Sequence, residues 1–132
     1  MRKIIMFNRV TLDGFFAGAH DEIDWFVLDP EVDKALHEMM NPDTVLFGSK
    51  TYEMFESYWP HVTDNPNAHE GERMMANELT KMDKLVFSKK LTNSTWENSH
   101  FFNGGLAEEV KKLKQSEGAD VVSFTFCKTV FF

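Results

Sequence analysis

The chain has 132 residues, of which 42% are hydrophobic and 27% charged, a composition that predicts one globular domain over residues 1–132 and excludes intrinsic disorder. The net charge of −7 argues against a nucleic-acid partner, and no apolar run approaches the roughly 20 residues of a membrane-spanning helix. The single cysteine, Cys127, excludes an internal disulfide and, with no signal peptide in view, indicates a cytoplasmic protein.

Strands and helices alternate along the chain. The first half of the chain is expected to form a strand over Lys3–Phe7, a helix opened by Asp29 and Pro30 and closed by Pro42, a strand over Thr44–Phe47, and a helix over Thr51–Tyr58 stopped by Trp59 and Pro60. A third helix is opened by Asn65 and Pro66 and runs to Met82. It is followed by strands over Lys84–Ser88 and His100–Phe102, a helix from Leu106 to Leu113, and a last strand of period two from Val122. This order predicts an α/β fold, with a mostly parallel sheet covered by helices on both faces. Ligands of such sheets bind beyond the carboxyl ends of the strands.

Helical spacing also predicts which side chains face the core. In the first helix the apolar face is expected to be buried, and it consists of Val32, Ala35, Leu36, Met39 and Met40. In the second helix the inward residues are expected to be Met54, Phe55 and Tyr58.

The stretch Val45–Glu53 joins a buried strand directly to a helix at Gly48. Glycine allows a sharp turn and close approach of a ligand, and the helix start offers free N–H groups. With the hydroxyls of Ser49 and Thr51 and the ammonium of Lys50, this junction has the chemistry of a phosphate site. The alternative is an ordinary capped helix with a surface lysine.

A second strand end carries similar groups. Between Lys81 and Lys90 there are four lysines and one acid, in a chain whose region from His20 to Glu56 has a local charge of −8. Ser88 ends the predicted strand and Lys89 follows it, so a ligand with more than one phosphate group could use both strand ends. A solvated turn is the alternative.

Two aspartates complete the set of candidates. Asp13 lies on the loop after the first strand, and Asp24 precedes Trp25 and Phe26. A carboxylate beside aromatic residues can hold a protonated nitrogen heterocycle or relay a proton. The alternative is a turn aspartate and a helix-flanking aspartate. No histidine or cysteine spacing indicates a metal site, so none is expected.

Taken together, these motifs resemble the dihydrofolate reductase-like superfamily, and most closely the stand-alone relatives of the C-terminal reductase domain of the riboflavin-biosynthesis deaminase/reductase. The stretches that carry the resemblance are Phe7–Gly18, Ile23–Phe26, Val45–Glu53 with Tyr58–Pro60, and Lys84–Lys90, and it continues to about Val122.

The resemblance implies an NADPH-dependent reductase of a pterin-like or ribosylaminopyrimidine-like ring. It implies cofactor contacts from Gly48, Ser49, Lys50, Thr51, Ser88 and Lys89, substrate contacts from Asn8 and Trp25, and catalytic roles for Asp13 and Asp24. The sequence departs from the family after Val121, where a glycine-rich turn, a helix and closing strands are expected but no glycine follows Gly118. It therefore resembles a shortened member that lacks the last strands of the fold.

Two further expectations follow. The shortened end favours an alternative function, a non-catalytic dimeric protein that keeps the fold and binds a nucleotide or a flavin such as FMN. An apolar last strand left without covering strands also predicts a homodimer, with an interface between Val121 and Phe132.

Overall fold

The computed structural model describes residues 1–20, 22, 25, 27 and 29–124. The described elements are, in chain order, β1 (Ile4–Phe7), α1 (Pro30–Met39), β2 (Pro42–Gly48), α2 (Ser49–Val62), α3 (Glu70–Lys81), β3 (Asp83–Phe87), β4 (Ser99–Phe102), α4 (Leu106–Gln115) and β5 (Asp120–Phe124). The strands form one sheet in the order β1-β5-β2-β3-β4, and every pair is parallel. The predicted order of elements and the parallel sheet are confirmed.

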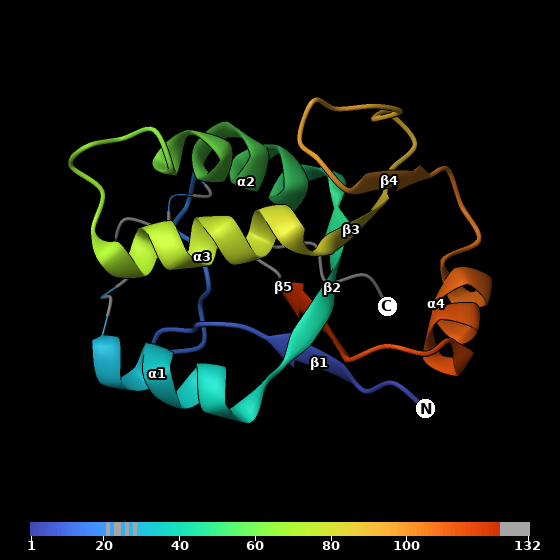
Figure 1. The fold of residues 1–132 in the computed structure, drawn as a ribbon, viewed down its shortest axis with the longest axis horizontal. Coiled ribbons are helices and arrows are strands. Elements are labelled where there is room, and N and C mark those ends of the chain that lie inside the picture. Colours follow the sequence, from blue (N-terminus) through green and yellow to red (C-terminus); the bar gives the residue numbers. More distant parts are fainter. Residues whose placement is uncertain (21, 23–24, 26, 28, 125–132) are drawn as a thin grey trace.

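Helices cover both faces of this sheet, as predicted. The connections from β1 to β2 and from β2 to β3 run in one direction across the sheet, whereas the connection from β4 to β5 runs back. Because crossovers between parallel strands are right-handed, α1, α2 and α3 lie on one face and α4 on the other. Figure 1 shows this arrangement, with α4 on the opposite side of β2 and β3 from the other three helices.

An aromatic and aliphatic core holds α2 and α3 against the sheet. Its buried members are Val45, Phe47, Tyr52, Phe55, Leu79, Val86, Trp96 and Val122. The Tyr52 hydroxyl donates to the Ser99 hydroxyl oxygen at 2.9 Å, so this buried polar group is satisfied. The core therefore fixes the start of α2 relative to β3 and β4.

Two helix boundaries differ from the prediction. α2 continues through Pro60 to Val62. Pro60 costs only one hydrogen bond so near the helix end, and the burial of Val62 beyond it favours the continued helix. α3 begins only after His69, which forms a capping box with Glu72: the Glu72 carboxylate accepts from the His69 amide at 2.9 Å. Asn65 and Pro66 lie in turns before it.

The predicted inward faces are only partly correct. In α1, Leu36 and Met40 are half-buried, but Met39 is 77% exposed and Val32 and Ala35 are exposed too. In α2, Phe55 is buried, whereas Tyr58 is exposed and donates its hydroxyl hydrogen to Glu72 at 2.7 Å. The apolar spacing of α1 identified a helix correctly without identifying a buried face.

Part of the homodimer interface expected from the sequence lies in β5. Val121–Phe124 pair with β1 on one side and with β2 on the other, so this strand has no open edge. The remaining residues of that expectation, 125–132, lie outside the described residues. The homodimer itself stays a prediction.

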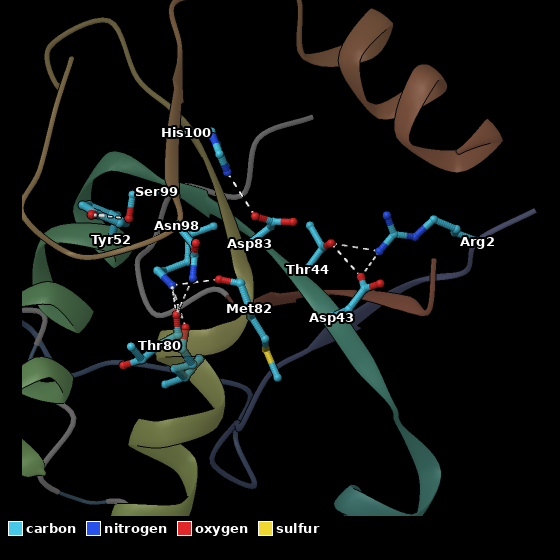
Figure 2. Close-up of polar contacts among 12 residues, drawn as sticks. Arg2, Asp43, Thr44, Tyr52, Thr80, Met82, Asp83, Asn98, Ser99 and His100 are labelled. Carbon is cyan, nitrogen blue, oxygen red and sulfur yellow. Dashed lines mark hydrogen bonds and ion pairs between the residues drawn. The ribbon is translucent and has the colours of Figure 1, made fainter. Parts of the chain in front are cut away.

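A polar cluster closes the edge of the sheet formed by the amino ends of the strands. Figure 2 shows Arg2 directed at Asp43 and Thr44. Arg2 forms an ion pair with Asp43 and donates to the Thr44 hydroxyl at 2.8 Å and to the Ala119 carbonyl at 2.7 Å. Partial burial raises the pKa of Asp43, but the Thr44 hydroxyl, the Ala119 amide and the Arg2 charge outweigh it and lower that pKa below its usual value. These groups stabilise the fold at the edge opposite the predicted ligand site.

Candidate functional site

The carboxyl ends of β2 and β3 bring the two predicted phosphate motifs together. Gly48 at the end of β2 lies opposite Phe87 at the end of β3 in the parallel register. Ser49 and Ser88 follow directly, so they leave the sheet from neighbouring strands, which are ~4.8 Å apart in such sheets. Two motifs separated by almost forty residues in sequence thus meet at one edge.

The first motif is the start of α2. Gly48 is the N-cap residue, has extended backbone angles (φ −84°, ψ 166°) and makes no side-chain capping bond. Any residue can adopt this conformation, so the turn itself does not require glycine, contrary to the expectation from the sequence. Ser49 is half-buried and Lys50 exposed, whereas Thr51 is only 7% exposed. Ser49 is therefore the more accessible hydroxyl of the two.

The second motif is a compact turn after β3. The Ser88 hydroxyl oxygen accepts from the amides of Lys90 and Leu91 at 3.1 and 3.0 Å, and the Ser88 amide donates to the Phe102 carbonyl at 3.0 Å. The turn fixes the backbone while Lys89 and Lys90 remain exposed. In its bonds with the Lys90 and Leu91 amides the Ser88 hydroxyl acts as the acceptor, so these bonds do not use its own hydrogen.

Lys84 does not belong to this basic surface, although the sequence places it in the same cluster. It is fully buried, and its ammonium donates to the carbonyls of Leu79, Met82 and Thr80 at 2.7, 2.8 and 3.3 Å. It also lies 4.7 Å from the centroid of the Trp96 ring. Lys84 therefore caps the carboxyl end of α3, where the helix dipole favours a positive charge.

The carboxyl end of α3 is also hydrogen-bonded to the segment that leads into β4. The Asn98 side chain donates to the Thr80 carbonyl at 3.0 Å, and the Asn98 carbonyl accepts from the Lys84 amide at 2.7 Å. Figure 2 shows Asn98 close to Thr80 and Met82. Asn98 also has a positive φ of 57°, a conformation that asparagine tolerates better than most residues.

We expect the burial of Lys84 to appear in the pH dependence of stability. Burial lowers the pKa of Lys84 to about 8, against the opposing charges of Asp83 and Glu97, whereas an unfolded lysine titrates near ~10.4. Between these values the unfolded chain binds more protons, so stability rises with pH by up to ~3 kcal/mol from this group. Lys84→Met should therefore cost more stability at pH 10 than at pH 7.

Urea unfolding of both proteins at the two pH values measures this difference, and other titrating groups cancel in the comparison. A cost of Lys84→Met that is equal or smaller at pH 10 contradicts the prediction.

The loop after β1 holds Asp13 in a defined position. The Thr11 hydroxyl donates to the Asp13 carboxylate at 2.6 Å and accepts from the Phe15 amide at 2.9 Å. The Thr11 amide in turn donates to the Phe15 carbonyl at 2.7 Å, and Gly14 completes the turn with a φ of 89°. Thr11 thus orients the carboxylate, a role that the sequence analysis missed and that a hydroxyl residue two positions before an aspartate in a turn could have indicated.

Asp13 and Trp25 line one cavity of about 390 Å³. Its other lining residues come from the same loop and are Thr11, Phe15, Ala17, Gly18 and Ala19. The structure therefore brings together one predicted catalytic residue and one predicted substrate residue. Asn8, also predicted to contact substrate, is exposed just beyond the end of β1. Asp24 lies outside the described residues.

A second cavity, of about 470 Å³, lies at the opposite edge and is lined by residues 1–3 and 115–120. Arg2 in its wall already donates to Asp43, Thr44 and Ala119. Glu117 and Asp120 line it together with Lys3, so the remaining lining charge is of both signs and does not select an anionic ligand. A phosphate-bearing cofactor therefore fits the carboxyl edge better.

None of the helices in the described part of the chain is long and apolar enough to span a membrane. Over the same residues, no group of three or more metal-ligating side chains gathers in one place.

The five-stranded parallel sheet with helices on both faces is consistent with the dihydrofolate reductase-like fold of the family that the chain matches. The chain belongs to the RibD C-terminal domain family, which it matches over residues 2–125, and it is thus a domain of the riboflavin-biosynthesis reductase type. It is also similar to the protein YyaP of Bacillus subtilis (strain 168), with 34% identity over 121 residues. That alignment covers 91% of this chain and 61% of YyaP, so the chain spans about three fifths of its relative.

Proposed function

We propose that this chain binds NADPH at the carboxyl ends of β2 and β3 and reduces a pterin-like or ribosylaminopyrimidine-like ring. The observation that carries the proposal is the register of Gly48 with Phe87, which places the start of α2 beside the turn that begins at Ser88. Each strand end offers a hydroxyl and an exposed ammonium. Membership of the RibD C-terminal domain family also supports this proposed function.

The groups at this edge fit a cofactor with separated phosphates. Ser49 and Lys50, with the amides of the first turn of α2, would hold the pyrophosphate, because the helix start carries a partial positive charge. Ser88 and Lys89 would contact the phosphate on the adenosine ribose and so select NADPH over NADH. The Lys50 ammonium is a compact charge, unlike the planar guanidinium of arginine, so it would attract the pyrophosphate more than orient it.

The cavity after β1 would receive the ring that is reduced. When bound, the nicotinamide supplies the hydride for a C=N or C=O group. Asp13, oriented by Thr11, would hold a protonated ring nitrogen or deliver a proton, and Trp25 would pack against the ring. The protein thus contributes orientation and a proton path.

Calorimetric titration of the full chain with NADPH, NADH and FMN tests the proposal. One charge-assisted contact to a phosphate is worth ~1.5–3 kcal/mol, so NADPH should bind at least about tenfold more tightly than NADH. Equal affinities for the two nicotinamide cofactors contradict the assignment of Ser88 and Lys89. Tight binding of FMN alone would support the non-catalytic flavin-binding alternative instead.

A further inference from the structure

The segment between β3 and β4, residues 88–98, is anchored along its length although it contains no helix or strand. Leu91 packs against the core, and the Trp96 ring is buried 5.8 Å from the ring of Tyr52 in α2. Figure 1 shows this segment beside the start of α2. The exposed lysines that follow β3 therefore belong to a segment that is packed on the helix.

A polar contact with α2 lies between these two apolar anchors. The Ser94 hydroxyl donates to the Glu56 carboxylate, and its oxygen accepts from the Trp96 amide at 2.9 Å. Glu56 and Ser94 are both half-buried, which limits competition from water for this hydrogen bond. Because the acceptor is charged, the bond is stronger than one between neutral groups.

The contact fixes the segment relative to the first phosphate motif. Glu56 lies seven residues after Ser49, which is two helical turns, so both residues lie on the same face of α2 about 10 Å apart. Ser88 leaves the sheet beside Ser49, and Ser94 reaches Glu56 six residues later. The turn that carries Lys89 is thus held between two points along one helix face.

We propose that Glu56 is a positioning residue of the cofactor site. By holding Ser94, it keeps the turn that carries Lys89 in place beside the start of α2, and it thereby sets the preference for NADPH over NADH. This inference rests on the proposed function, in which the two motifs hold different phosphates of one cofactor.

The effect of Glu56 through Ser94 is opposite in sign to its direct electrostatic effect. A carboxylate repels the phosphates of a cofactor, so removal of its charge alone would strengthen binding. Loss of the hydrogen bond would instead weaken binding, because the ordered turn would become a smaller fraction of the population. The two effects can therefore be separated by experiment.

Calorimetric titration with NADPH and NADH compares Glu56→Ala with the matched control Glu53→Ala. Glu53 is exposed on the same helix, and its removal changes the net charge equally. Glu56→Ala should lower the NADPH affinity about 5-fold or more and change the NADH affinity less than about 2-fold. Glu53→Ala should leave the NADPH affinity unchanged or raise it. Glu56→Gln, which retains an acceptor oxygen, should restore most of the affinity.

Hydrogen exchange of the Lys90 and Leu91 amides, resolved by NMR, tests the same contact without any cofactor. Both amides donate to the Ser88 hydroxyl oxygen, so their exchange reports how often the turn opens. They should exchange at least about 5-fold faster in Glu56→Ala than in the wild type, and at the wild-type rate in Glu53→Ala. Ser94→Ala, which removes the other partner of the bond, should accelerate them as well.

Circular dichroism establishes that each variant keeps its fold, and Ser94→Ala serves as the test variant should Glu56→Ala not fold. Equal exchange of the two amides in the variant and in the wild type overturns the inference. An equal loss of affinity for both cofactors, or a loss in Glu56→Gln as large as in Glu56→Ala, also overturns it. A wild-type chain that binds NADPH and NADH equally contradicts the proposed function instead, and faster exchange in Glu56→Ala then still supports the positioning of the turn by Glu56.

Discussion

Gly118→Ala should lower the free energy of unfolding by about 3 kcal/mol, which is one of the two largest effects that the structure predicts. Gly118 has a φ of +146°, where side chains are strongly disfavoured. An added Cβ would also lie 2.8 Å from the Asp43 carboxylate and 2.9 Å from the Arg2 guanidinium carbon. That pair is held by Thr44 and Ala119 and cannot move without losing hydrogen bonds.

Gly104→Ala separates backbone strain from crowding. Gly104 has a similar φ of +139°, but an added Cβ would meet no heavy atom within 4 Å. This variant should therefore lose only the strain, about 1–2 kcal/mol. Equal losses in urea unfolding would show that crowding of the Arg2 and Asp43 pair contributes nothing.

Lys89→Ala should reduce the affinity for NADPH by about 10- to 150-fold and leave the affinity for NADH almost unchanged. The reason is that Lys89 is exposed directly after the end of β3, where the turn begun by Ser88 fixes the backbone. Calorimetric titration of the variant with both cofactors measures the effect.

Lys81→Ala is the control for a general charge effect. Lys81 belongs to the same basic stretch of sequence but ends α3, near the amino end of β3. Its removal should change neither affinity appreciably. A loss of NADPH affinity as large as that of Lys89→Ala would mean that net charge, rather than a contact, determines binding.

Much of the fold could be predicted because local patterns and topology agree. Five short strands, all but β3 and β4 separated by helical patterns, allow few arrangements other than a mostly parallel sheet. The junctions at Gly48 and Ser88 could likewise be predicted from the sequence, although β3 ends at Phe87, one residue earlier than expected. Helix limits were less predictable: the end of α2 depends on burial of Val62, and the start of α3 on the pairing of His69 with Glu72.

Charge and apolar spacing were less reliable guides to location. Lys84 counts as a surface cation in sequence, yet it is a core residue, because carbonyl groups at the end of α3 are available to it. The apolar face of α1 was expected to be buried, yet Met39 is exposed. The carbonyl groups that accept from Lys84 lie only two to five residues before it in the chain, but the end of α3 gathers them around the ammonium, and a count of charges in the sequence does not contain that geometry.

The most direct test of the proposed cofactor site is backbone hydrogen exchange of the full chain with and without saturating NADPH. We expect slower exchange in peptides that cover residues 48–52 and 88–91, because both strand ends would contact phosphates. Peptides that cover residues 1–3 and 115–120, which line the cavity at the opposite edge, should be unchanged. Protection at that opposite edge alone, or no protection at either strand end, would contradict the account.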